Sequence, residues 1–193
     1  MKLRFFYFLL LIVMLGSCNS NKESSTLGTK GKEQTEILQA LQVVDSLYQN
    51  KVIDIPQMSH FVTTAKQFAE NYPEDKMAPH YLFKAGVLSM EMAGIANNKT
   101  ETVRFAQDAI NIFNDIQKVY PDFEDIRLCI YNRGVVYDNI LHDYRSAEIE
   151  FRDYIHKYPQ DANTEWLIEY VDKYLGKTTD ELASEIIVDS KKN

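Results

Sequence analysis

The chain has 193 residues, with 45% hydrophobic and 25% charged side chains and a formal net charge of −7. This composition is typical of a globular protein and excludes a disordered one. The acidic balance repels phosphate backbones, so we expect no nucleic-acid partner. Glycine and proline disrupt helix interiors, and the low counts of 7 and 5 suit a mostly helical protein.

The chain opens with a targeting segment. Two basic residues precede an apolar run, Phe5 to Leu15, which is too short to span about 30 Å of hydrocarbon at ~1.5 Å per residue. The run ends in Leu15-Gly16-Ser17-Cys18. This sequence resembles the lipobox of bacterial lipoproteins, which implies that residues 1–17 are a signal peptide and that Cys18 is acylated. A plain secretory leader with an accidental cysteine is the alternative.

Residues 18–34 are then the lipidated cysteine and a flexible tether. After Cys18 the segment is polar, with Leu27 as its single large apolar residue, so it cannot bury enough surface to offset the entropy of ordering. Asn19 differs from the aspartate that resembles an inner-membrane retention signal. The segment also lacks the strong acidic run that marks surface export in some Gram-negative lineages. We therefore expect an outer-membrane lipoprotein that faces the periplasm.

Helical spacing of apolar residues predicts an all-α domain over residues 35–189, with a polar tail at 190–193. The expected helices are one that ends near Asn50, one capped by Asp54, and others over about 77–96, 100–119, 123–141, 144–157, 163–175 and 182–188. Asp122 is the expected cap of the fifth helix, and Thr178 with Glu181 forms a capping box for the eighth. Helices one and two, three and four, and five and six form pairs, and the last two cover the end.

One short pattern recurs along these helices. Its copies are Ala109, Phe113, Ile116, Tyr120-Pro121; then Ala147, Phe151, Tyr154, Tyr158-Pro159; and, more weakly, Phe61, Ala65, Phe68, Tyr72-Pro73. The offsets from the first residue are +4, +7, +11 and +12 in each copy. Each copy places small and aromatic residues on one helical face and ends the helix at a proline.

This pattern resembles the tetratricopeptide repeat (TPR), in which two antiparallel helices pack closely. The resemblance implies a right-handed α-solenoid of about three irregular helix pairs, with Gly86 and Gly134 at the positions that let the second helix approach the first. Gly134 to Ala147 is one residue longer than the family's spacing, and Gly86 to Ala109 is longer by about a helical segment. An ordinary helical bundle with chance Tyr-Pro endings is the alternative.

No catalytic constellation is found in the sequence. None of the four histidines belongs to a recognised metal motif, and no nucleophile elbow, phosphate loop or dinucleotide fingerprint occurs. Cys129 lies between Leu128 and Ile130, and we expect it to be a buried apolar side chain and not a reactive thiol. We expect no enzyme activity, no cofactor and no metal.

The TPR resemblance also implies a binding groove along the first helix of each pair. The implied groove residues are His80, Phe83, Lys84, Val87 and Met90 on the third helix, and Tyr131, Asn132, Val135 and Asp138 on the fifth. Their mixture of aromatic, apolar and polar groups suits an extended peptide or a partner helix. The alternative is that neighbouring helices, including the insertion between Gly86 and Ala109, cover part of this face.

The sequence thus favours a lipid-anchored TPR adaptor that binds a protein or peptide segment in an envelope assembly or transport complex. The alternatives are an accessory subunit of an envelope enzyme and a solute-binding lipoprotein. Fold analogy alone does not choose the role.

Overall fold

The computed structural model describes residues 20–181, with side chains from Gly28 onward, and every regular element in that range is helical. The elements are α1 (Ser20–Gln49), α2 (Ile55–Asn71), α3 (Ala78–Ile95), α4 (Lys99–Val119), α5 (Ile126–Val135), the π-helix η1 (Val136–Leu141), α6 (Tyr144–Lys157) and α7 (Thr164–Lys173). The predicted signal peptide, Cys18, the eighth helix and the tail lie outside the described residues. The all-α prediction is confirmed for the described part of the chain.

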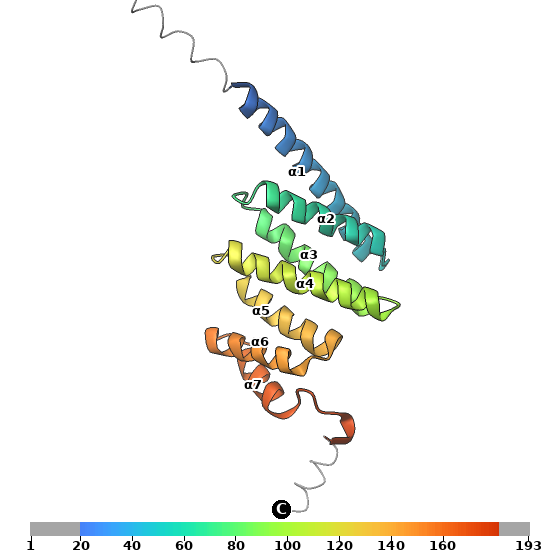
Figure 1. Ribbon diagram of the computed structural model, residues 1–193, viewed down its shortest axis with the longest axis vertical. Helices are drawn as coiled ribbons and strands as arrows, with labels where there is room; N and C mark the ends of the chain where they lie inside the picture. The colour runs from blue at the N-terminus through green and yellow to red at the C-terminus, as the bar shows by residue number, and fades with distance from the viewer. Residues whose placement is uncertain (1–19, 182–193) are drawn as a thin grey trace, which may run out of the picture.

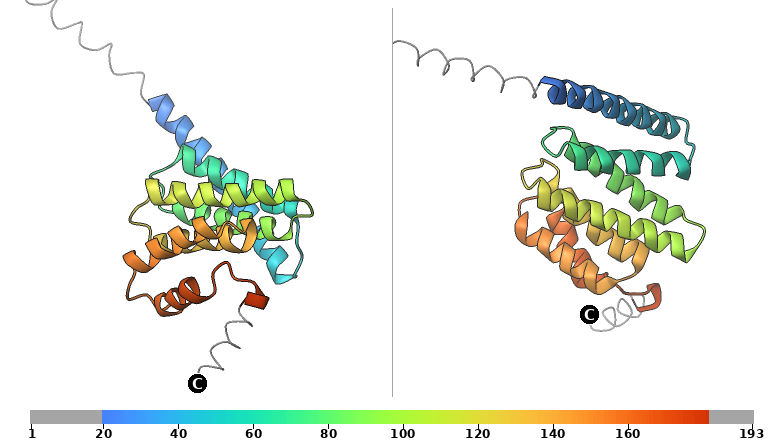
Figure 2. Two further views of the ribbon diagram at one scale, coloured as in Figure 1. Left: turned by 60° about the horizontal axis from the view of Figure 1, so that its bottom comes forward. Right: turned by 45° about the horizontal axis from the view of Figure 1, so that its top comes forward.

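Consecutive helices stack on one another along the long axis of the molecule (Figure 1). The left view in Figure 2 shows α1 at one end of the stack and α7 at the other. Each helix packs on the one before it and the one after it in the chain. The predicted pairs α1 with α2, α3 with α4, and α5 with α6 are therefore present.

Most helix boundaries follow from local capping. The Asp54 carboxylate accepts from the backbone N–H of Gln57 at 3.0 Å, and Pro56 lies in the first turn of α2. The Asn98 side chain caps α4: its amide oxygen accepts from the backbone N–H of Glu101 at 2.9 Å, and its amide nitrogen donates to the Glu101 carboxylate at 2.7 Å. Gly176, after α7, has the positive φ of 73° that glycine adopts at low cost.

Two boundaries differ from the predictions. The first helix begins at Ser20, so the segment predicted as a tether is helical from that residue onward. Long-range contacts hold its middle: Lys30 pairs with Asp75 at 2.9 Å, and Asn71 donates to Glu33 at 2.9 Å. The polar composition of this segment predicted a tether. That prediction missed the contacts with α2 and with the turn after it, because such contacts cannot be read from local sequence.

The fifth helix begins at Ile126, not Phe123, and Asp122 does not cap it. Residues 121–125 lie in turns between α4 and α5. These turns place the Phe123 side chain in the core, where it is 8% exposed.

The three Tyr-Pro sites share one hydrogen-bond pattern. At each site the tyrosine N–H donates to the carbonyl four residues earlier, and its own carbonyl accepts from the residue three positions later. These bonds join Tyr72 to Phe68 and Asp75, Tyr120 to Ile116 and Phe123, and Tyr158 to Tyr154 and Asp161, at 2.8–3.0 Å. The matched offsets in the sequence therefore build three equivalent turns between hairpins.

Gly86 and Gly134 sit where two helices approach closely. A β-carbon on Gly86 would lie 2.6 Å from Phe113 Cε1, and one on Gly134 would lie 2.5 Å from Phe151 Cδ1. Real β-carbons do not approach ring atoms so closely, so a side chain at either position would force the helices apart. The prediction that these two glycines are packing residues is confirmed.

The two irregular spacings also have a structural explanation. The extra residue between Gly134 and Ala147 coincides with η1, because the i→i+5 bonding of a π-helix holds one more residue than an α-turn. The longer segment between Gly86 and Ala109 extends α3 and α4, with 18 and 21 residues, and adds no separate element. This insertion therefore does not fold across the face of its own hairpin.

Arg133 joins three helices inside the stack. Its guanidinium, on α5, donates to Gln117 of α4 at 2.7 Å and to Glu150 of α6 at 2.6 Å. The Arg133 side chain is 6% exposed and that of Glu150 is 19% exposed. A charge buried to this degree requires its partners, so this group ties the second hairpin to the third.

Candidate functional site

The predicted groove residues occupy α3, α5 and η1. Eight of the nine are half-buried, and Asp138 is buried at 6% exposure. Half-burial is expected of side chains on the open face of a hairpin, because one side of each side chain contacts the core. The two ends of this face are engaged within the molecule, whereas its middle is not.

At the α1 end, Lys84 is already paired. Its ammonium lies 3.6 Å from the Asp45 carboxylate and 4.7 Å from the centre of the Tyr48 ring, both on α1. An exposed ion pair contributes little, but the cation–π contact and the pair together fix the position of the side chain. Lys84 therefore holds α1 against α3 and is not a free contact for a partner.

At the α7 end, Asp138 is covered. The Tyr170 hydroxyl donates to its carboxylate at 2.5 Å. Desolvation, together with this hydrogen bond, raises the pKa of Tyr170. The prediction of Asp138 as a groove residue is therefore wrong, because α7 folds over it. Periodicity along α5 could not reveal a contact between residues so far apart in the sequence.

The middle of the face is formed by aromatic side chains that lean on the core. The Phe83 ring lies 5.9 Å from both Phe113 and Phe123, and the His80 ring lies edge-on to Phe123 at 5.1 Å. On α5, the Tyr131 ring lies 6.0 Å from Phe151 and 5.8 Å from Tyr154. Val87, Met90 and Val135 also pack partly against the core. These residues therefore form a half-buried surface that is supported by the core.

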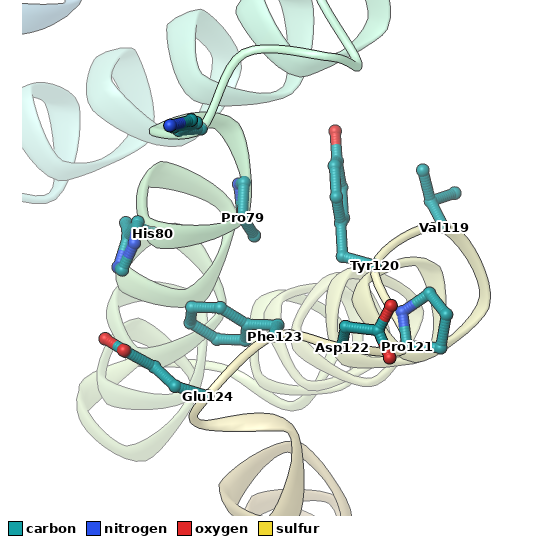
Figure 3. Close-up of a pocket in the computed structure, with 9 residues that line it drawn as sticks. Pro79, His80, Val119, Tyr120, Pro121, Asp122, Phe123 and Glu124 are labelled. Atoms are coloured by element: carbon teal, nitrogen blue, oxygen red, sulfur yellow. The ribbon is translucent and has the colours of Figure 1, made fainter.

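A hollow of about 420 Å³ adjoins this face (Figure 3). Pro79 and His80 line it from α3, and residues 119–124 line it from the other side. Lys76 is also in its lining. Phe123 forms its floor beside His80. Its mixed apolar and charged lining and its wide mouth suit a peptide side chain better than an enclosed small molecule.

One exposed aromatic residue escaped the sequence analysis. Trp166 on α7 is 54% exposed, and its ring stacks on Tyr170 at 5.2 Å with an interplanar angle of 13°. Trp166 follows Pro159 by seven residues, as His80 follows Pro73. Leu128 follows Pro121 at the same distance, so the Tyr-Pro offset could have identified Trp166 as the third residue at this position.

No arrangement in the described part of the chain indicates catalysis. No cluster of three metal-ligating side chains occurs among residues 28–181. Cys129 is fully buried, and burial raises the pKa of its thiol to about 12, which keeps it protonated and inert at neutral pH. Within the described range, no helix is long and apolar enough to cross a bilayer.

No protein-family model, curated protein or solved structure matches this chain. Its function must therefore be argued from its own residues.

Proposed function

We propose that this protein is a non-enzymatic TPR-like adaptor lipoprotein of the Gram-negative outer membrane. In this proposal Cys18 carries the lipid anchor, the helical stack faces the periplasm, and its open face binds a segment of an envelope protein. The partner belongs to an assembly or transport complex.

The observation that carries the proposal is the repetition of one packing unit. Two glycines, each 13 residues after a Tyr-Pro proline, receive a phenylalanine ring from the second helix of their hairpin, and three turns share one hydrogen-bond pattern. Repeated hairpins of this kind form extended surfaces for binding protein segments. The repetition of these contacts and turns favours a TPR-like solenoid and disfavours a bundle in which the Tyr-Pro endings occur by chance.

The aromatic side chains of the open face also support the proposal. His80, Phe83 and Tyr131 are half-buried rings that pack against aromatic rings of the core, so a partner would meet side chains that are already ordered. Preorganised aromatic groups lose little entropy on binding and are enriched in binding hot spots. An extended peptide or a helix suits this face, because the face combines aromatic, apolar and polar side chains and its middle is not covered by another helix.

A cross-linked pull-down from intact cells tests the proposal. The protein should co-purify from solubilised outer membranes with one or a few envelope proteins in constant ratio. A photo-cross-linking amino acid at Asn132 should capture that partner, and one at Ile149, which is 63% exposed on α6, should not. Equal capture from both positions, or none from either, would contradict the proposed face.

A further inference from the structure

A second hollow lies at the other end of α3 from the first one. It has a volume of about 580 Å³ and sits where the C-terminal ends of α1 and α3 meet the α1–α2 loop. Its lining is Val44, Leu47, Tyr48, Lys51, Val52, Ile53, Met58, Glu91, Gly94 and Ile95. Pockets that bind small ligands have this size and this predominance of apolar groups.

The walls combine a buried floor with an exposed apolar rim. Val44 and Met58 are 1% and 5% exposed, whereas Val52 is 50% and Ile53 is 65% exposed. Ile95, on the facing side, is 38% exposed. Exposed apolar side chains that gather around one hollow indicate a binding site more strongly than the same residues scattered over a surface.

Two charged side chains, Glu91 and Lys51, line this hollow, and they differ in their contacts. The Tyr48 hydroxyl donates to the Glu91 carboxylate, so that carboxylate already has a partner. Among the described residues, Lys51 forms no ion pair and is exposed. Lys51 is thus the unpaired cation at the mouth of an apolar hollow.

Backbone geometry presents Lys51 and its neighbours at the mouth. Lys51 has a φ of 55°, and the bonds from Lys51 N–H to Tyr48 and from Val52 N–H to Leu47, at 3.1 and 2.9 Å, end α1 in a Schellman motif. Glycine usually occupies this left-handed position, and lysine is there at a conformational cost. The motif directs Val52 and Ile53 to the rim that Lys51 flanks.

We propose that this hollow binds the alkyl chain of a singly charged anionic amphiphile, such as a fatty-acid carboxylate, with Lys51 pairing to its head group. The apolar floor accounts for the chain, and the free ammonium accounts for the anionic head. The protein's own predicted anchor would not supply the chain. Helix α1 has 30 residues and is about 45 Å long, and the hollow lies at the opposite end of this helix from Ser20. The ligand therefore comes from outside the chain.

Calorimetric titration with decanoate, below its micellar concentration, tests this proposal. The protein should carry Cys18→Ser so that no detergent is needed. We expect saturable binding of one decanoate per chain and at least tenfold weaker binding of hexanoate, because each buried methylene group changes affinity about fourfold. Decyltrimethylammonium, which has the same chain and a cationic head, should bind at least fivefold more weakly than decanoate.

Two variants separate the two parts of the ligand. Ile53→Glu places a carboxylate on the rim and should weaken decanoate binding at least tenfold, whereas Ile149→Glu, at a comparably exposed site on α6, should leave it unchanged. Lys51→Gly suits the left-handed backbone and should keep the fold, but it should abolish the preference for decanoate over decyltrimethylammonium.

Absence of saturable decanoate binding would overturn the proposal, as would binding that Ile53→Glu leaves intact. If decanoate does not bind but Ile53→Glu abolishes partner capture, the hollow receives a protein side chain and the ligand proposal fails. This titration uses no partner protein, so its result is independent of the proposed adaptor function.

Discussion

The Phe151 ring occupies the space that any side chain on Gly134 would need, since a β-carbon there would lie 2.5 Å from Cδ1. Gly134→Leu should therefore destabilise the protein by roughly 1–3 kcal/mol through overpacking. For a domain of this size, that corresponds to a fall in melting temperature of about 2–12 °C.

Gly94 provides the matched control for this substitution. It lies near the end of α3, and a β-carbon on it would meet nothing within 4 Å. Gly94→Ala should leave the melting temperature unchanged or raise it, because alanine favours a helix by up to about 1 kcal/mol over glycine. A melt of Gly134→Leu that matches wild type would show that the two helices can separate without cost.

Local sequence predicted the helices well where helix ends carry their own signals. The Asp54 cap and the Tyr-Pro endings of α2, α4 and α6 all lie where the sequence indicates. Contacts between residues that are far apart in the chain could not be predicted from local sequence. The pair Lys30–Asp75 joins α1 to the turn after α2, and the pair Tyr170–Asp138 covers one predicted groove residue. Neither pair follows from a period or a motif in the sequence.

The ion pair between Arg133 and Glu150 should contribute more to stability than the surface pairs. Glu150→Ala leaves a guanidinium that is 6% exposed without its counter-charge, and removal of one partner from a buried pair costs about 3 kcal/mol or more. The control is Glu148→Ala, which breaks a 2.8 Å pair between side chains that are about half exposed and should cost less than about 1 kcal/mol. Urea titrations of the two variants measure the difference, and similar losses would show that Arg133 is easily rehydrated.

Cys129 should make stability fall at high pH. Burial raises the pKa of its thiol to about 12, so the folded state keeps its proton over a range in which the unfolded chain loses it. The contribution of the protonated Cys129 thiol to stability is therefore complete below its pKa in the unfolded chain, near 9. It declines as the pH rises towards 12, by at most about 1.4 kcal/mol per pH unit.

Urea titrations at pH 8 and pH 10.5 test this dependence. Wild type should lose more stability between the two pH values than Cys129→Ala, because the raised tyrosine pKa values, such as that of Tyr154, act in both proteins. In addition, a thiol reagent at pH 8 should modify Cys129 only after unfolding. Rapid modification of the folded protein would show that the thiol is accessible.

The lipid anchor is tested by cell fractionation. Cys18→Ser should move the protein from the membrane pellet to the soluble periplasmic fraction, because the apolar run before Cys18 is too short to hold it across a bilayer. The matched control is Ser17→Ala, which keeps a small residue before the cysteine and should leave the protein in the pellet. A Cys18→Ser protein that resists high-salt and carbonate washing of the membranes would contradict acylation at this position.

Partner capture should depend on the middle of the open face. Tyr131→Ala removes a ring that contacts Phe151 and Tyr154, so we expect weaker capture together with a loss of about 1–2 kcal/mol in stability. Asn132→Arg separates these two effects, because it adds a bulky charge beside Tyr131 without removing a core contact. It should reduce capture at least tenfold and leave the melting temperature within about 2 °C of wild type.

Ile149→Arg on α6, at 63% exposure, is the control for added charge and should capture the partner normally. If Asn132→Arg captures as well as Ile149→Arg does, the partner binds elsewhere on the stack. The exposed Trp166, stacked on Tyr170, is then the next position to test, because it follows its Tyr-Pro proline by the same seven residues as His80.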